Sequence, residues 1–275
     1  MKTVPTVAIG FTTPSHVDEE HNLALMSAIG LANLDHNVLY IDLSAAKKDH
    51  SSPTCSQSGL SLRDFLDGKR HLRELIFKSP LGIDVISTNF CKKSLLKATP
   101  LELTNLIESF DTLEQNFDFL ILNFPDKATA SSLFLLEACH IQIMSIEPTS
   151  KSIGKAYKLL EHLKKTSHVD DVYLLPTSVP SISYGWKLFQ RFNQAIIVSL
   201  NIQTKYLASL KSLPTLTSSH LKESLPNAIG YEPICDIIEK IESLKSKSTL
   251  AALKDFNLHF DLLQVRRELA IYEDL

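Results

Sequence analysis

Apolar residues follow two alternating patterns along most of the chain. Short apolar runs, typical of buried strands, alternate with longer stretches in which apolar residues recur every three or four positions, as on one side of a helix. The strand-like runs are residues 6–10, 38–43, 83–87, 117–124, 141–146 and 172–175. The helix-like stretches are residues 19–34, 61–77 (one or two short helices interrupted at Gly68), 100–115 and 150–165. Because strands that alternate with helices form βαβ units, the sequence predicts a doubly wound α/β fold, with a mostly parallel sheet and helices on both faces.

The run at residues 117–124, FDFLILNF, is nearly continuous in apolar residues. This pattern is typical of a strand at the centre of a sheet that is covered on both faces. Residues 47–59 are instead rich in Ser, Asp, Pro and Gly, which indicates a loop. We expect one α/β domain over residues 1–245 and a helical tail over residues 246–275.

Composition narrows the class of protein. The formal net charge of −3 argues against non-specific binding of nucleic acids, which normally needs a basic face. No stretch approaches the roughly 20 apolar residues of a membrane span. The first residues, MKTVPTVAIGF, lack the apolar region and cleavage site of a signal peptide. The 4 cysteines are far apart and form no C-x-x-C pair. These features predict a cytoplasmic protein with reduced thiols.

Two kinds of catalytic or binding site find no support. His16 and His21 bracket an acidic run, but their spacing does not place two ligands on one helical face, so we expect no metal site. The chain also lacks the G-x-S-x-G motif, which leaves a hydrolase unsupported.

Four segments carry a resemblance to a known family. They are residues 22–44 (NLALMSAIGLANLDHNVLYIDLS), 59–77 (GLSLRDFLDGKRHLRELIF), 117–126 (FDFLILNFPD) and 137–163 (EACHIQIMSIEPTSKSIGKAYKLLEHL). Together they resemble the MinD/ParA family of P-loop ATPases, and in particular its flagellar-placement branch, called FlhG or FleN. The most specific match is the turn formed by Glu147, Pro148, Thr149 and Ser150. The resemblance implies a nucleotide site at the carboxyl ends of the parallel strands.

The segment that corresponds to the P-loop departs from the family pattern K-G-G-x-G-K-[ST]. Residues 11–22, FTTPSHVDEEHN, contain no glycine and no lysine. Glu20 and His21 fall where the family has its second lysine and its hydroxyl, and Pro14 lacks a backbone N–H. Ser15 and Asp18 fit a capping box, which would place acidic side chains where the family binds phosphate. The altered positions are Thr13, Pro14, Ser15, Asp18, Glu19, Glu20 and His21.

Further positions of the family's site are altered independently. Asp42 is retained after the second strand, but Ser44 replaces the second acid of the family's D-x-D motif. Asn123 replaces the aspartate that supports Mg²⁺ at the end of the central strand. The late asparagine that contacts adenine in the family is missing near Pro176 and Thr177. We therefore expect no catalytic residues, no nucleotide cofactor and no ATPase activity.

The helix predicted at residues 150–165 is rich in lysine. A ParA-like face for DNA is one interpretation, but Glu161 and the interspersed apolar residues favour an ordinary solvated face.

The C-terminal tail has two apolar stripes if residues 250–272 form one helix. The stripe of Leu253, Phe256, Phe260 and Leu263 can dock on the body of the protein. The second stripe consists of Leu262, Val265, Leu269 and Tyr272, and we expect it to bind a protein partner. Flagellar relatives attach to membranes through such a helix, but acidic residues such as Asp255 and Asp261 disfavour anionic lipid here. Packing within the chain is the remaining alternative.

These observations favour a non-catalytic pseudo-ATPase with a degenerate P-loop. The resemblance implies a bacterial regulatory or positioning partner of a cell-surface machine: a flagellum, a pilus or a cellulose-synthesis complex. Such a protein would act through a protein partner, or as a homodimer or heterodimer with a related ATPase. It would be cytoplasmic, or peripheral at the inner membrane through its partner. Two alternatives stay open: a diverged ATPase that still binds nucleotide, and a ParA-like module associated with DNA.

Overall fold

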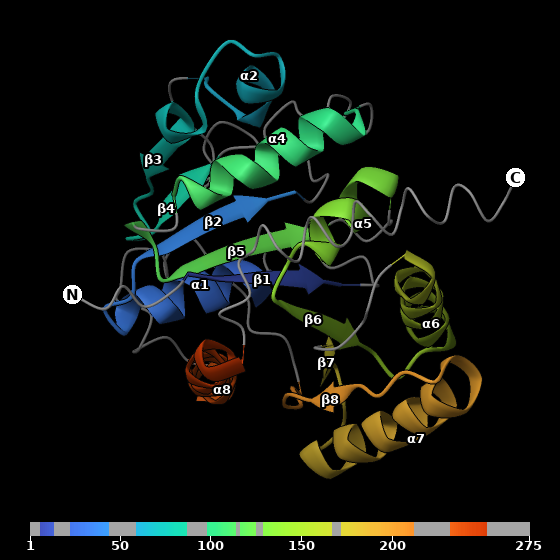
Figure 1. Cartoon of the computed structure of the whole chain (residues 1–275). Coiled ribbons are helices and arrows are strands. Elements are labelled where there is room, and N and C mark those ends of the chain that lie inside the picture. The colour runs from blue at the N-terminus through green and yellow to red at the C-terminus, as the bar shows by residue number, and fades with distance from the viewer. Residues whose placement is uncertain are drawn as a thin grey trace, which may run out of the picture.

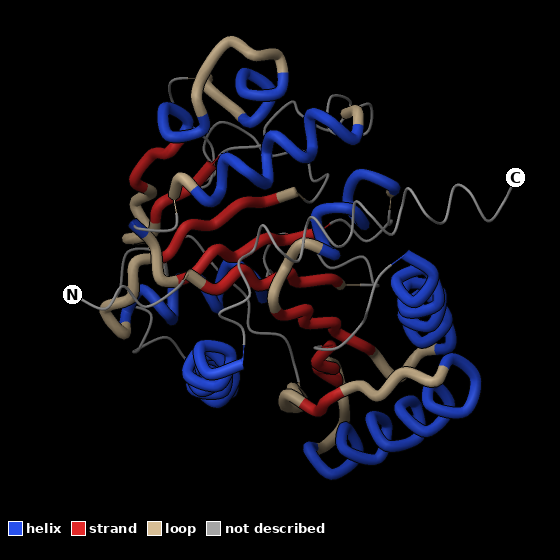
Figure 2. Tube along the Cα trace, viewed as in Figure 1, coloured by secondary structure: helices blue, strands red, loops and turns tan. Residues whose placement is uncertain are grey.

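The computed structural model describes residues 6–13, 23–43, 59–86, 98–113, 116–124, 129–166, 172–211 and 232–251. Within these residues an eight-stranded sheet has the strand order β3-β4-β2-β5-β1-β6-β7-β8 (Figures 1 and 2). The strands are β1 (Val7–Thr12), β2 (Val38–Asp42), β3 (Ile76–Lys78), β4 (Asp84–Ile86), β5 (Phe119–Phe124), β6 (Ile141–Ile146), β7 (Val172–Pro176) and β8 (Lys205–Tyr206). The helices are α1 (Leu23–Asn33), α2 (Leu62–Leu66), the 3₁₀ helix η2 (Leu72–Leu75), α4 (Pro100–Asp111), α5 (Ala130–Glu137), α6 (Ser150–Thr166), α7 (Ile182–Leu200) and α8 (Glu232–Ala251).

All neighbouring strands are parallel except β3, which pairs with β4 in the antiparallel sense. The predicted doubly wound α/β fold is therefore confirmed, and β5 lies at the centre between β1 and β2 as its apolar run predicts. The helical prediction for residues 61–77 is wrong at its end, because Ile76 and Phe77 pair with β4 as an edge strand. A two-residue apolar run fits a helix and a strand equally well, and the neighbouring strand decides.

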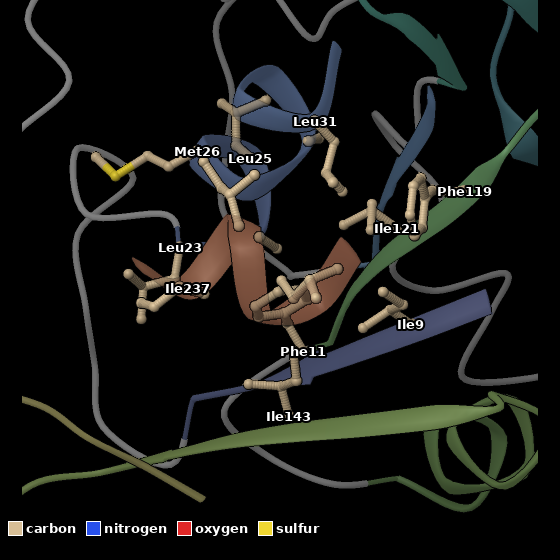
Figure 3. Packing of buried hydrophobic residues seen from close by; sticks show 14 of the residues in the cluster. Ile9, Phe11, Leu23, Leu25, Met26, Leu31, Phe119, Ile121, Ile143 and Ile237 are labelled. Atoms are coloured by element: carbon tan, nitrogen blue, oxygen red, sulfur yellow. The ribbon is translucent and has the colours of Figure 1, made fainter. Parts of the chain in front are cut away.

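The two faces of the sheet are covered by different helices. Figure 1 shows α1 and α8 on one face and α4, α5, α6 and α7 on the other. Side chains of β1 alternate accordingly: Ile9 and Phe11 pack with α1 and α8, whereas Ala8 packs with α4 and α5. Figure 3 shows the first core from close by, with Phe11 near Ile143 and Ile237 of α8. Strand β1 therefore contributes side chains to the cores on both faces of the sheet.

Gly10 in β1 marks the closest approach between the sheet and a helix. A Cβ atom at this position would lie 2.6 Å from Leu136 Cδ1 and 3.1 Å from Cys139 Sγ, both at the end of α5. Since real Cβ contacts are longer, only glycine lets α5 pack this tightly on β1. The helix therefore packs directly against β1 at Gly10.

Helix α8 is fastened to the amino ends of β2 and β5. Lys245 Nζ donates a 2.6 Å hydrogen bond to Asp118 Oδ1, and His36 Nε2 lies 3.0 Å from Glu242 Oε1. The backbone N–H of Asn37 donates to the other Asp118 oxygen at 2.9 Å. Burial alone would raise the pKa of Asp118, but these hydrogen bonds and the charges of Lys245 and His36 together lower it. These contacts hold α8 against α1 and against the amino end of β5.

The boundary predicted between residues 245 and 246 falls inside α8, which continues to Ala251. The rest of the predicted tail lies outside the described residues. Within the described part of the chain, no helix is both long and apolar enough to cross a bilayer.

Candidate functional site

The carboxyl ends of β1, β2 and β5 meet at one edge of the sheet. Phe11 of β1 and Asp42 of β2 both lie in register with Asn123 of β5, which stands between them. In doubly wound folds, ligands bind outside this edge. The structure therefore brings together two of the predicted positions, Asp42 and Asn123, at the place where the resemblance puts a nucleotide site. Thr13 directly follows β1 at the same edge and is half-buried.

Asp42 and Asn123 bind each other. Asn123 Nδ2 donates a 3.1 Å hydrogen bond to Asp42 Oδ1, with only 3% of Asp42 and 9% of Asn123 exposed to solvent. An ionised carboxylate only accepts hydrogen bonds, so the amide must turn its NH₂ group toward it. The backbone supports this arrangement, because Leu43 N donates to Asn123 O at 2.8 Å. The amide group thus faces the carboxylate as a donor and neutralises none of its charge.

The turn after β6 is organised by its own hydroxyl groups. Thr149 Oγ1 accepts a hydrogen bond from Ser152 N at 3.2 Å, and Ser152 Oγ accepts one from Glu147 N at 2.9 Å. These bonds satisfy backbone N–H groups at the start of α6, as an N-cap does. The turn predicted at Glu147, Pro148, Thr149 and Ser150 therefore exists as a strand-to-helix connection.

The carboxyl end of β7 is closed by backbone contacts with the chain that follows β8. Leu210 N donates to Pro176 O at 2.8 Å, and Val179 N donates to Leu210 O at 3.2 Å. Gly185 at the start of α7 lies so close to Ser209 that a Cβ would clash with it. Thr177 is buried beneath this crossing, and its backbone N–H donates to Ile146 O at 2.8 Å. The region near Pro176 and Thr177, where the resemblance puts adenine, is thus packed against the protein's own backbone.

Several predicted site residues lie outside the described residues. They are Pro14, Ser15, Asp18, Glu19, Glu20 and His21 of the P-loop segment, Ser44 after β2, and Leu262, Val265, Leu269 and Tyr272 of the tail. Their predicted roles stay predictions.

The sequence analysis missed helix α7 and the aromatic cluster beside it. Trp186 and Phe189 of α7 lie with their ring centroids 4.8 Å and 5.3 Å from that of Tyr206 in β8. A signal for this helix was present in the sequence, because its buried residues recur at helical spacing: Gly185, Phe189, Phe192, Ile196 and Leu200.

Comparison of the structure with solved structures defines the fold. The MinD protein of Pyrococcus horikoshii, solved with Mg-ADP, superposes with a TM-score of 0.66 at 15% identity, covering 87% of this chain and 97% of that one. The MinD of the MinC:MinD complex of Aquifex aeolicus superposes with a TM-score of 0.65 at 12% identity, covering 86% of this chain and 96% of that one. The chain has the fold of MinD and the ParA family ATPases. With this fold, the edge that holds Asp42 and Asn123 corresponds to the nucleotide edge of doubly wound proteins.

Comparison of the amino-acid sequence with known proteins finds a relative of this chain. The antiactivator FleN of Pseudomonas aeruginosa is 20% identical over 186 residues, which are 68% of this chain and 66% of FleN. The match thus spans just under two thirds of the length of that relative. Comparison with models of protein families gives no match. The resemblance to the flagellar-placement branch is borne out by this relative, and the MinD/ParA resemblance by the fold.

Proposed function

We propose that this chain is a regulatory protein with a MinD/ParA fold that does not hydrolyse ATP and that acts by binding another protein. FleN is described as an antiactivator, and MinD has been solved in complex with MinC. We infer a similar role here, in the control or placement of a cell-surface machine, with the flagellum as the first candidate.

The contact between Asn123 and Asp42 carries this proposal. Mg²⁺ prefers oxygen ligands at about 2.1 Å in octahedral geometry. At this edge an amide NH₂ group points at the carboxylate instead, and it can neither ligate a cation nor add negative charge. A metal ion that took the place of the Asn123 amide at Asp42 Oδ1 would break this buried hydrogen bond, which costs about 1–3 kcal/mol.

The sequence before α1 supports the same proposal. Backbone N–H groups can converge on phosphate where glycines leave room, and lysines neutralise its charge. Residues 11–22 contain neither glycine nor lysine, but hold three carboxylates. Each carboxylate about 6 Å from a phosphate charge would cost roughly 3 kcal/mol at an effective dielectric constant near 20.

The test is release of phosphate from Mg-ATP by the purified full chain, with an active MinD protein measured in parallel. The proposal expects no release above that of buffer. The variants Glu20→Lys and Asn123→Asp, alone and together, should stay inactive because the glycines remain absent. Turnover by the unmodified chain would support the alternative of a diverged ATPase instead.

Partner binding is the second part of the proposal. The predicted contact is the tail stripe of Leu262, Val265, Leu269 and Tyr272. Leu269→Asp should abolish association with the partner and leave the melting temperature nearly unchanged, whereas Phe260→Asp should lower the melting temperature. Equal destabilisation by both variants, with association intact, would reduce the tail to a structural element.

A further inference from the structure

Two neighbouring helices of this chain, α6 and α7, carry an excess of positive over negative charge. They hold 7 of its 28 lysine and arginine residues but only Glu161 of its 31 aspartate and glutamate residues. The rest of the chain is strongly acidic. Both helices pack over the same core cluster beside β6 and β7 (Figure 1). Because the two helices contact each other, their exposed cations lie on neighbouring elements of an otherwise acidic protein.

The cations of α6 lie in a single stripe. Lys151, Lys155, Lys158, His162 and Lys165 follow one another at intervals of three or four residues, which places them on one side of the helix. The opposite side is buried through Ala156, Leu160 and Leu163. Within the described residues, no carboxylate pairs with Lys151, Lys158 or Lys165. Lys151, Lys158 and Lys165 are thus available to an acidic ligand.

The outer side of α7 combines cations with exposed apolar side chains. Tyr184, Lys187, Arg191, Gln194 and Val198 share the side of the helix opposite its buried residues. Val198 is 77% exposed, the highest value among the large hydrophobic residues that the structure describes as exposed. Five of the seven such residues lie on α7: Ile182, Tyr184, Trp186, Ile197 and Val198. Helical spacing places Tyr184 and Val198 on the same side as the cations, and the other three on a flank of the helix.

We propose that the outer faces of α6 and α7 bind an acidic amphipathic segment of a partner protein. Carboxylates of that segment would pair with Lys151, Lys158 and Lys165 of α6 and with Lys187 and Arg191 of α7. One or two apolar side chains would cover Tyr184 and Val198. The inference rests on the proposed function, because it defines the chemistry of the partner segment. The outer faces of α6 and α7 would be a second contact surface besides the tail.

Two features favour a protein segment over a nucleic acid or a membrane. Phosphate groups offer nothing to cover Val198, whereas a protein segment supplies apolar side chains. A DNA duplex or a bilayer also extends well beyond two helices and would meet the acidic remainder of the surface within a Debye length of about 8 Å. A short segment contacts the outer faces of α6 and α7 alone.

The test is fluorescence anisotropy with labelled probes and the full chain. The probes are a helical peptide with glutamates and leucines on one face, the same peptide with glutamine for glutamate, and a 20-base-pair duplex. Vesicles with phosphatidylglycerol are tested by co-sedimentation. The proposal expects saturable binding of the acidic peptide, weakened at least tenfold in the glutamine peptide. Tighter binding of the duplex or of the vesicles would overturn it, as would no binding of the acidic peptide.

Variants then locate the site. Lys158→Glu combined with Arg191→Glu should weaken peptide binding at least tenfold, and Val198→Asp should weaken it severalfold. Lys164→Glu is the matched control, because Lys164 is an exposed lysine of α6 that lies off the stripe. Its affinity should stay within twofold of that of the unmodified chain. Equal losses in control and stripe variants would overturn the proposal. Repeating the titration with Mg-ATP separates this inference from the ATPase question, since peptide binding should not change.

Discussion

Two acidic side chains at opposite edges of the sheet have partners of different kinds. At the carboxyl edge, Asp42 accepts a hydrogen bond from the neutral amide of Asn123. At the amino edge, Asp118 forms an ion pair with Lys245, whose side chain is 8% exposed. The partner of Asp118 in this contact carries a full charge, whereas the Asn123 amide offers Asp42 a dipole. The ion pair of Asp118 and Lys245 fastens helix α8 at the amino edge of the sheet, away from the edge where we expect the nucleotide site.

The difference shows that the Asp118–Lys245 ion pair supports packing of the fold at the amino edge. An ATPase site needs cations and paired acids at the carboxyl edge, because phosphate and Mg²⁺ are highly charged. In the described residues of this chain, the shortest ion pair involving a buried side chain lies at the amino edge and joins elements of the fold. The following variants test that contrast.

The largest loss of unfolding free energy is expected for Asn123→Asp. The change places a second carboxylate within hydrogen-bonding distance of Asp42, and like charges so close together cost about 3 kcal/mol at pH 7. Urea unfolding at pH 7 and at lower pH measures the cost, which should shrink as one carboxyl takes up a proton. Asn123→Ala serves as the control, because it removes the same hydrogen bond without adding a charge, and its loss at pH 7 should be smaller, near 1 kcal/mol. A stable Asn123→Asp variant at pH 7 would show that the edge accepts a second acid.

A smaller loss of unfolding free energy is expected for Lys245→Met. It leaves Asp118 without its main partner, while the partly exposed carboxylate keeps some contact with water, so we expect a loss of about 2 kcal/mol. The matched control is Lys69→Met, which removes the exposed pair with Asp67 and should leave the unfolding free energy nearly unchanged, because solvent screens that pair. Chemical unfolding of both variants gives the comparison. Equal losses would mean that the Asp118 pair does not fasten α8 in the way its burial implies.

The pH dependence of the same pair is expected to be modest. The pKa of Asp118 is lower in the folded protein than the ordinary value of 3.8, so its ion pair adds stability above that value. This contribution is lost as pH falls through the lowered folded pKa. The difference in unfolding free energy between the unmodified chain and Lys245→Met should stay constant from about pH 5 to 7 and shrink below about pH 4. A difference that grows on acidification would contradict the assignment.

The smallest effect is expected for Glu242→Gln. Its contact with His36 is 3.0 Å long, but the Glu242 side chain is 46% exposed. Exposed pairs contribute little, so the unfolding free energy should change by less than about 0.5 kcal/mol. A loss as large as that of Lys245→Met would place His36 and Glu242 among the main anchors of α8.

The arrangement of the sheet was predictable from the sequence, but its contacts were not. Apolar runs such as residues 117–124 revealed six of the strands, because a buried parallel strand needs a continuous apolar sequence. The strand ends placed Asp42 and Asn123 at one edge. That the amide of Asn123 turns toward Asp42 depends on side-chain geometry, which no periodic pattern encodes. The pair of Asp118 and Lys245 joins residues 127 positions apart and left no local signal.

The central claim is that this MinD/ParA fold no longer binds ATP. Isothermal titration calorimetry of the full chain with Mg-ATP, at high micromolar protein concentration, tests it most directly. The MinD protein used as the hydrolysis standard should give a clear binding isotherm under the same conditions. For this chain the account predicts no heat of binding beyond dilution. A saturable isotherm with a Kd tighter than about 10 µM would contradict it.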